Sequence, residues 1–312
     1  MTQSLNLVFC GTPEFAVPTL EQLVAAGFRI SQVVTQPDRP RGRKLELAPS
    51  AVKARSLQLG LPVTQPATIK NNQEFRALLT AINPDAIIVV AYGRIIPQWM
   101  IDLPRLGNIN LHASLLPKYR GAAPIQWAIA NGESVTGVTT MLIDAGLDTG
   151  DILLQTEIPI ADNDTAESLS PRLASIGADL MVTTLNRLAT GDLLAHPQNN
   201  AEATLVPILR KEDGRIDFQR SAGEILNRLR AFQPWPGAFT TFRGKSLQVL
   251  SAKPVSKRIV PAELVIENDQ LLVGCAEHTS LELLEVQPEG KKRMSARDFI
   301  HGYHPHAGEK LG

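Results

Sequence analysis

Cysteine is nearly absent from this sequence, since only Cys10 and Cys275 occur among 312 residues. Neither cysteine has a second thiol close to it in the chain, so the paired spacings of metal-binding and redox motifs are missing. An isolated cysteine usually behaves as a small buried hydrophobe. We therefore expect both thiols to lie in hydrophobic cores.

The sequence also lacks net charge and long apolar runs. Its 31 Lys and Arg residues balance 31 Asp and Glu residues, which argues against a protein that coats polyanions. A local basic patch could still bind nucleic acid. The N-terminus has no basic stretch, and the apolar run over residues 5–10 is too short for a signal peptide or a membrane span. We expect a cytoplasmic monomer without membrane contact.

What remains is an ordinary globular composition, with 44% hydrophobic and 20% charged residues and no low-complexity tract. The chain is longer than the roughly 100–200 residues of one domain, so two domains are expected. After Gly191 a polar segment with Pro and Asn interrupts the apolar pattern. We place a first domain at residues 1–190, a linker at 191–206 and a second domain at 207–312.

The first domain alternates apolar runs with amphipathic stretches, which is the pattern of strand-helix-strand units. The run over residues 86–91 is apolar throughout, as expected of a strand buried on both faces of a parallel sheet. The fold class is therefore predicted as α/β with an open, mostly parallel, Rossmann-like sheet. Strands are predicted at residues 5–10, 30–35, 86–91 and 109–112 and as a hairpin at 136–143 and 152–158, with helices at 51–60, 71–82, 122–131 and 165–189.

The second domain has one helical segment, residues 222–232, followed by short alternating runs between Gly and Pro turns. Several short strands of this kind predict a small barrel, and an oligonucleotide-binding (OB-like) β-barrel is one candidate. A β-sandwich fits the pattern nearly as well.

Two polar residues, Asn110 and His112, lie near the C-terminal end of a predicted strand. Side chains alternate along a strand, so both point to one face while Ile109 and Leu111 pack on the other. Open α/β sheets bind ligands at the carboxyl ends of their strands. An amide donor and a titratable imidazole are thus expected side by side at that edge, although such a pair can also be purely structural.

The loop over residues 144–151 has two glycines and three carboxylates, Asp144, Asp148 and Asp151. It can be a solvated hairpin loop or, despite lacking the spacing and terminal Glu of an EF-hand, a calcium site. Alternatively, Asp148 orients His112 and raises its basicity.

Several ordered motifs resemble one known family. The first set is Asn110-x-His112, then Ser114-Leu115-Leu116-Pro117-x-Tyr119-Arg120-Gly121, and Asp148 within Gly-Leu-Asp-Thr-Gly, which is similar to the folate-dependent formyltransferase superfamily. Its methionyl-tRNA formyltransferase branch is indicated by Gly11-Thr12-Pro13-Glu14-Phe15-Ala16, Gln36-Pro37-Asp38-Arg39-Pro40, Val90-Ala91-Tyr92-Gly93, Arg230-Ala231-Phe232-x-Pro234-Trp235-Pro236 and Gly290-Lys291-Lys292-x-Met294-Ser295-Ala296. The resemblance covers nearly the whole chain.

The resemblance implies transfer of a formyl group from 10-formyltetrahydrofolate, as co-substrate, to the amino group of methionyl initiator tRNA. Asn110, His112 and Asp148 would be the catalytic residues, with the first two donating to the oxyanion that forms on the formyl carbonyl. Asp148 would hold the imidazole and help the attacking nitrogen lose its proton. No metal is required. Folate would contact Tyr92, Gly93, Ile95, Ser114, Leu115, Leu116, Pro117 and Asp144.

Basic residues cluster at two places that could contact tRNA phosphates. In relatives, the first of these segments reaches the acceptor end of tRNA, which the resemblance carries over to this chain. The candidate residues are Arg39, Arg41, Arg43 and Lys44 in the first domain and Lys291 and Lys292 in the second. Either cluster could instead be a solvated loop.

Three other functions are alternatives to this one. A formyltransferase for a small amine, such as a purine precursor or an amino sugar, would keep the same three polar residues without the basic loop. A formyltetrahydrofolate hydrolase would use water in place of the amine. A non-catalytic RNA-binding protein is disfavoured by the presence of Asn110, His112 and Asp148 together.

Overall fold

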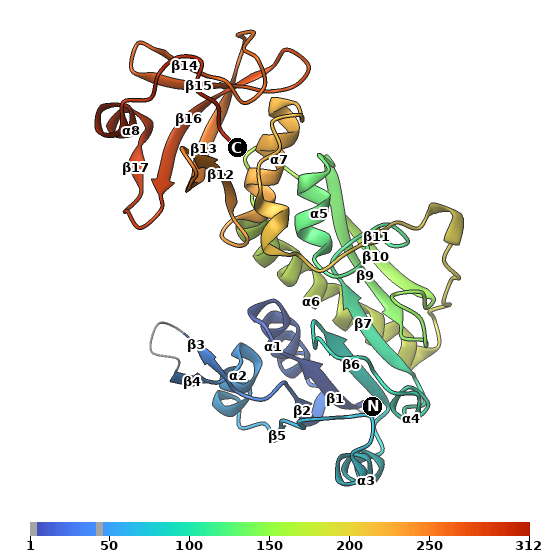
Figure 1. The fold of residues 1–312 in the computed structure, drawn as a ribbon. Helices are drawn as coiled ribbons and strands as arrows, with labels where there is room; N and C mark the ends of the chain where they lie inside the picture. The colour runs from blue at the N-terminus through green and yellow to red at the C-terminus, as the bar shows by residue number, and fades with distance from the viewer. Residues whose placement is uncertain (1–4, 42–45) are drawn as a thin grey trace. The chain divides into compact units, whose positions relative to one another are not determined.

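The computed structural model of this chain describes residues 5–41 and 46–312 (Figure 1). Two compact units emerge from it, and neither is continuous in sequence. The first contains residues 1–121, 135–158 and 170–205, and the second contains residues 122–134, 159–169 and 206–312. No helix in the described part of the chain combines the length and the apolar character needed to span a bilayer.

The first unit is built on a seven-stranded sheet in the order β10-β9-β7-β6-β1-β2-β5. Strands β5, β2, β1, β6 and β7 run parallel, and β9 is antiparallel to β7. The predicted open, mostly parallel α/β sheet is therefore confirmed. Its strands are β1 (Asn6–Gly11), β2 (Arg29–Val34), β5 (Val63–Thr64), β6 (Ala86–Val90), β7 (Asn108–His112), β9 (Val135–Leu142) and β10 (Ile152–Pro159).

Two small ribbons accompany this sheet. Strands β3 (Arg39–Arg41) and β4 (Glu46–Ala48) form an antiparallel pair, and β8 (Arg120–Gly121) pairs with β11 (Leu205–Val206). The central strands β1 and β6 are almost fully buried, which explains why their sequences are apolar runs without alternation. Both cysteines are buried as predicted, and burial raises the pKa of the Cys10 thiol.

Several helices begin where a side chain accepts a free N–H group of the first turn. Ser50 accepts from the Lys53 N–H at 3.0 Å, and Thr165 accepts from the Ser168 N–H at 3.1 Å. The chain also contains α1 (Val17–Ala25), α2 (Ala51–Gln58), α3 (Gln73–Ile82), α4 (Gln98–Ile101), α5 (Pro124–Ala130), α6 (Ala166–Thr190), α7 (Ala222–Phe232) and α8 (Ala296–Tyr303), with short 3-10 turns η1 (Glu14–Ala16), η2 (Asn200–Glu202) and η3 (Lys211–Gly214).

Helix α6 packs against the back of the strand that carries the polar pair. A Cβ atom added at Gly177 would lie 2.6 Å from Cδ2 of Leu111, so any larger residue there would displace the Leu111 side chain. Leu111 is buried on this side, as the strand alternation predicted. The face of β7 that bears Asn110 and His112 is therefore left for other contacts.

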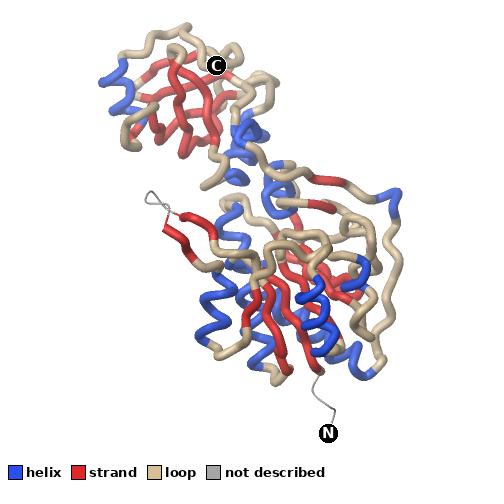
Figure 2. The backbone as a smooth tube through the Cα atoms, turned by 60° about the horizontal axis from the view of Figure 1, so that its bottom comes forward, coloured by secondary structure: helices blue, strands red, loops and turns tan. Residues whose placement is uncertain are grey.

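The second unit holds an antiparallel sheet in the order β12-β13-β16-β15-β14, with β17 pairing β16. These strands are gathered with the C-terminus beside them (Figure 2). Their core contains Phe242, Val249, Leu283 and Phe299. The strands are β12 (Ala238–Phe242), β13 (Lys245–Val255), β14 (Leu264–Glu267), β15 (Gln270–Gly274), β16 (Ser280–Pro288) and β17 (Met294–Ser295).

The C-terminal segment bridges the two edges of this antiparallel sheet. The Leu311 N–H donates to the Ala262 carbonyl at 2.9 Å, and the Gly312 N–H donates to the Thr241 carbonyl at 3.0 Å. Ala262 precedes β14 and Thr241 lies in β12, the two strands at opposite ends of the order. The C-terminal segment thus connects the open edges, which gives the unit the barrel-like closure expected of several short strands.

Candidate active site

Strand β7 carries Asn110 and His112 at the predicted positions. Asn110 pairs with Val89 of the parallel neighbour, and His112 pairs with Thr139 of the antiparallel neighbour. Asn110 is half-buried, and no other group within residues 5–41 and 46–312 hydrogen-bonds its amide. This amide is therefore available to a ligand.

The His112 ring lies between a main-chain carbonyl and a carboxylate. Its Nε2 atom is 2.8 Å from the Tyr119 carbonyl oxygen, and its Nδ1 atom is 3.7 Å from Oδ2 of Asp148. A carbonyl oxygen only accepts, so Nε2 carries the proton of that hydrogen bond. The Nδ1 distance is too long for a hydrogen bond and makes an ion pair only when the ring is protonated, and 7% of the imidazole is exposed. The two contacts define the orientation of the ring.

Asp148 reaches His112 because its loop folds back from the end of β9. Its backbone is left-handed, with φ +52°, and its Oδ2 atom accepts from the Gly121 N–H at 2.8 Å. Asp144 is instead exposed and accepts from the Gly146 N–H and the Thr149 hydroxyl at 3.0 and 2.7 Å. Of the three interpretations of this loop, the geometry favours a carboxylate beside His112. The described part of the chain contains no cluster of His, Cys, Asp or Glu able to hold a metal ion.

The segment Ser114–Pro117 is held to the sheet by two polar side chains. The Thr139 hydroxyl donates to the Ser114 carbonyl at 2.7 Å and accepts from the Leu116 N–H at 3.2 Å. The Gln155 amide donates to the Leu116 carbonyl at 2.9 Å. The fully buried Ser114 hydroxyl donates to the Lys118 carbonyl at 2.7 Å, so Ser114 shapes this loop. Leu115 and Pro117 are half-buried beside it.

Tyr92 and Gly93 form a turn directly after β6, at the same edge of the sheet as His112. Gln36 donates to both of their carbonyls, at 2.8 and 3.2 Å, and Thr12 donates to the Tyr92 carbonyl at 3.1 Å. The Tyr92 side chain is buried, which raises the pKa of its phenol. The Ile95 side chain is 92% exposed and therefore lies outside the hydrophobic core.

The basic residues are spread over both units. Arg39 begins β3 and donates to the Gln36 side chain at 2.6 Å, and Arg41 is the last residue of the same strand. Arg43 and Lys44 lie outside the described residues. Lys291 and Lys292 are exposed in the turn between β16 and β17 of the second unit.

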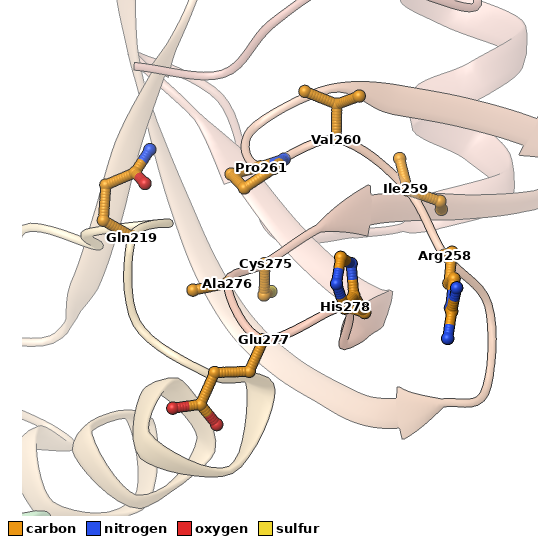
Figure 3. A pocket seen from close by; sticks show the side chains of 9 residues that line it. All are labelled: Gln219, Arg258, Ile259, Val260, Pro261, Cys275, Ala276, Glu277 and His278. Carbon is orange, nitrogen blue, oxygen red and sulfur yellow. The ribbon is translucent and has the colours of Figure 1, made fainter.

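A separate cavity of about 470 Å³ lies in the second unit (Figure 3). It contains none of the site residues predicted from the sequence. Burial raises the pKa of the Cys275 thiol in its wall to about 12. The remaining lining residues are Gln219, Arg258, Ile259, Val260, Pro261, Ala276, Glu277 and His278.

Residues that hold the loops in place were missed by sequence reasoning. Thr139, Gln155, Gln36 and Gln198 each bind main-chain atoms of a segment that carries a predicted site residue. Gln36 lies in one of the motifs that carry the resemblance, although its hydrogen bonds were not predicted. Thr139, Gln155 and Gln198 lie in none of these motifs, so their partners become visible only in the tertiary structure. Thr139 is the one residue of this group that the sequence could have indicated. The antiparallel strand next to the His112 strand must place a residue opposite His112, and that residue is Thr139.

Comparison with known proteins identifies the class to which this chain and its fold belong. Residues 5–185 match a family model described as formyl transferase, and residues 208–304 match the model for the formyl transferase C-terminal domain. An N-formyltransferase from Helicobacter canadensis, solved with folinic acid and dTDP-3-aminofucose, has the same fold. It shows a TM-score of 0.67 at 21% identity, covering 91% of this chain and 99% of that one.

The full-length relatives are more specific. A methionyl-tRNA formyltransferase of Koribacter versatilis is 69% identical over 306 residues, which is 98% of each chain. The one of Acidobacterium capsulatum is 59% identical over 301 residues, 96% of each chain. This chain belongs to the methionyl-tRNA formyltransferase family.

Proposed function

We propose that this chain transfers the formyl group of 10-formyltetrahydrofolate to the α-amino group of methionyl initiator tRNA in the cytoplasm, and that it acts as a monomer. The proposal rests on the placement of His112 between the Tyr119 carbonyl and Asp148, with the free amide of Asn110 on the same strand. The residues that would act on the formyl group lie in residues 1–190. Those of the second domain, residues 207–312, would contribute to tRNA binding.

The reaction joins the amine nitrogen to the formyl carbon and breaks the bond from that carbon to the folate nitrogen. As the amine attacks, the formyl oxygen becomes an oxyanion, to which the Asn110 amide donates. An anion is a stronger acceptor than a neutral carbonyl, so the oxyanion competes with Tyr119 for the Nε2 proton of His112. His112 would enter this step protonated on both ring nitrogens, and the negative charge of Asp148 would stabilise that charged ring.

Proton transfer completes the exchange. The attacking nitrogen loses one proton to Asp148, directly or through a water molecule, and the departing folate nitrogen takes up that proton, which returns Asp148 to its carboxylate form. The nucleophile needs little activation, because a free α-amino group has a pKa of about 7.7–8.0 and much of it is neutral near pH 7. No covalent intermediate with the enzyme forms in this scheme.

Folate would lie along the edge formed by the turn after β6 and the loop after β7. The turn contributes Tyr92, Gly93 and Ile95, the second loop contributes Ser114, Leu115, Leu116 and Pro117, and Asp144 borders them. Both segments are fixed by side-chain hydrogen bonds to their main chains, from Gln36 and Thr139. Such pre-ordered walls suit a rigid pterin ring.

Transfer RNA would be held by Arg39, Arg41, Arg43, Lys44, Lys291 and Lys292. Exchanging Lys291 and Lys292 for alanine should raise the KM for tRNA severalfold and reduce the salt dependence of binding, because each lost phosphate contact lowers the slope by about 1. Lys70→Ala, which removes an exposed lysine of the first unit, is the matched control. An unchanged salt slope would exclude these two lysines from the tRNA contact.

The defining experiment is formyl transfer from 10-formyltetrahydrofolate to methionyl initiator tRNA, with His112→Ala and with uncharged tRNA as controls. Formylmethionyl-tRNA that forms only with intact His112 and the methionyl group supports the proposal. Consumption of the folate without that product would redirect the search to a small amine or to water as acceptor.

A further inference from the structure

The segment over residues 196–205, here called the strap, lies along both loops of the candidate active site. His196 and Ile152 exchange main-chain hydrogen bonds of 2.8 and 2.9 Å. At the other end, Thr204 accepts the Arg120 N–H at 2.8 Å with its carbonyl and the Tyr119 N–H at 2.7 Å with its hydroxyl. The strap therefore touches the loop after β7 and the strand after the Asp148 loop, all within the first unit.

Gln198 is the residue of the strap that reaches the Asp148 loop. Its Nε2 atom donates to the carbonyls of Asp148 and Gly150, at 2.9 and 2.7 Å. Its Oε1 atom accepts from Nε and Nη2 of Arg120, at 3.0 and 2.8 Å. Two carbonyls require donors and a guanidinium requires an acceptor, so these partners fix the orientation of the amide. Both hydrogen atoms and the oxygen of the amide are used.

Arg120 connects Gln198 to the other half of the site. Its side chain is 6% exposed, and Nη2 also donates to the Asn200 side chain at 2.8 Å. Arg120 immediately follows Tyr119, whose carbonyl accepts from His112, and precedes Gly121, whose N–H donates to Asp148. A single glutamine thus joins the two short segments that orient the imidazole and the carboxylate.

The Asp148 main chain needs such support, because it is in a turn without regular secondary structure and has a φ of +52°. For a residue with a side chain this left-handed conformation is less favourable than the helical region. The carbonyls of Asp148 and Gly150 are the atoms through which Gln198 restrains the turn.

We propose that Gln198 is a positioning residue that holds Asp148 at its distance from His112 by binding the main chain of the Asp148 turn. This inference rests on the proposed function, because it matters for turnover only if Asp148 acts in the reaction. A displacement of about 1 Å in such a group can cost about 10²-fold in rate.

Gln198→Glu is the decisive variant. The carboxylate keeps the shape of the side chain and still accepts from Arg120, but it brings an acceptor against two carbonyl oxygens. If Gln198 only anchors the strap through Arg120, this variant is as active as the parent. If it positions Asp148, kcat falls about 10–100-fold while the KM for folate stays within about threefold.

Asn199→Ala is the control, since Asn199 is the next residue of the strap and, among residues 5–41 and 46–312, its side chain bonds only Ala201 and Glu202. It should alter kcat less than about twofold, in keeping with a local exposed cap. The concentration of folded sites in every variant is measured by titration with a folate analogue, which separates loss of folded protein from loss of turnover.

A double-mutant cycle with Asp148→Asn tests the coupling. Because both substitutions disable the same group, Gln198→Glu should lower kcat less than about twofold in the Asp148→Asn background. Two outcomes would overturn the inference and leave the proposed function intact. In the first, the effects of the two substitutions on kcat multiply in the double variant. In the second, Gln198→Glu keeps full kcat per folded site while Asp148→Asn is impaired. Full activity of Asp148→Asn itself would instead remove the role of Asp148 and, with it, the inference.

Discussion

One carboxylate oxygen of Asp148, Oδ2, accepts the Gly121 N–H at 2.8 Å and also faces Nδ1 of His112 at 3.7 Å. The hydrogen bond ties the carboxylate to the loop after β7, so its position relative to the imidazole does not depend on the exposed turn alone. The Tyr119 carbonyl contacts the His112 ring, and the Gly121 N–H contacts the Asp148 carboxylate. One short segment, residues 119–121, therefore holds both side chains.

Asp148→Asn should lower kcat strongly without loss of the fold. The asparagine oxygen can still accept the Gly121 N–H, but the negative charge that stabilises a charged His112 ring is gone. Since acid-base groups of this kind typically contribute about 10²–10⁴-fold, a loss of that size is expected in single-turnover formyl transfer. A variant with a normal melting temperature and normal turnover would exclude Asp148 from the chemistry.

Asn110→Asp tests the amide donor on β7. The carboxylate has the same shape but cannot donate, and its charge repels the developing oxyanion. We expect kcat to fall about 10²–10³-fold or more, with a smaller change in the KM for folate. Asn186→Asp, which makes the same exchange at an exposed position of α6, should leave kcat unchanged. Equal behaviour of the two variants would show that Asn110 does not contact the formyl group.

Gly93→Ala tests the turn proposed to border folate. Gly93 has a φ of +76°, and an added Cβ atom would lie 2.7 Å from Nε2 of Gln36, which must then release the turn. The KM for folate should rise severalfold, together with a loss of about 1–2 kcal/mol of stability from the left-handed backbone.

Gly60→Ala provides the matched control for this turn. Its φ is +68°, and nothing lies within 4 Å of the added Cβ atom. The same backbone strain should therefore lower the melting temperature without affecting the KM for folate. If the two variants differ in neither quantity, the Gln36 contact does not shape the folate site.

The sequence was informative where local pattern and physics agree. The apolar run of β6 follows directly from burial on both faces. The alternation of side chains in β7 places Asn110 and His112 on the same face of their strand. From the residues alone, the approach of Asp148 to His112 was one of three interpretations of the loop, because a loop that folds back leaves no periodic signal. The resemblance was needed to favour it. Gln198 lies 50 residues from Asp148 in a segment predicted only as a linker, and its hydrogen bonds depend on tertiary structure.

The closure of the second unit gives a prediction for stability at low pH. Arg243 binds both carboxylate oxygens of Glu309, at 2.8 and 3.0 Å, and Glu309 also accepts the His306 N–H at 2.6 Å. These hydrogen bonds, that of Arg243 first, lower the pKa of Glu309 to about 2. Glu309 belongs to the C-terminal segment that connects the sheet edges, so its charge supports that closure.

Because the folded-state pKa is below the ordinary value of about 4.3, the stabilisation is fully present above that value and is lost as the pH falls towards 2. Glu309→Gln should therefore lower the melting temperature at pH 7 by about 2–4 °C and by less at each pH below about 4. Hydrogen exchange at the Leu311 and Gly312 amides should quicken in parallel at pH 7. The control Glu267→Gln removes an exposed partner of Lys257 and should leave those amides protected. A melting difference that is the same at pH 3 and pH 7 would show that the charge of Glu309 does not hold the C-terminal segment.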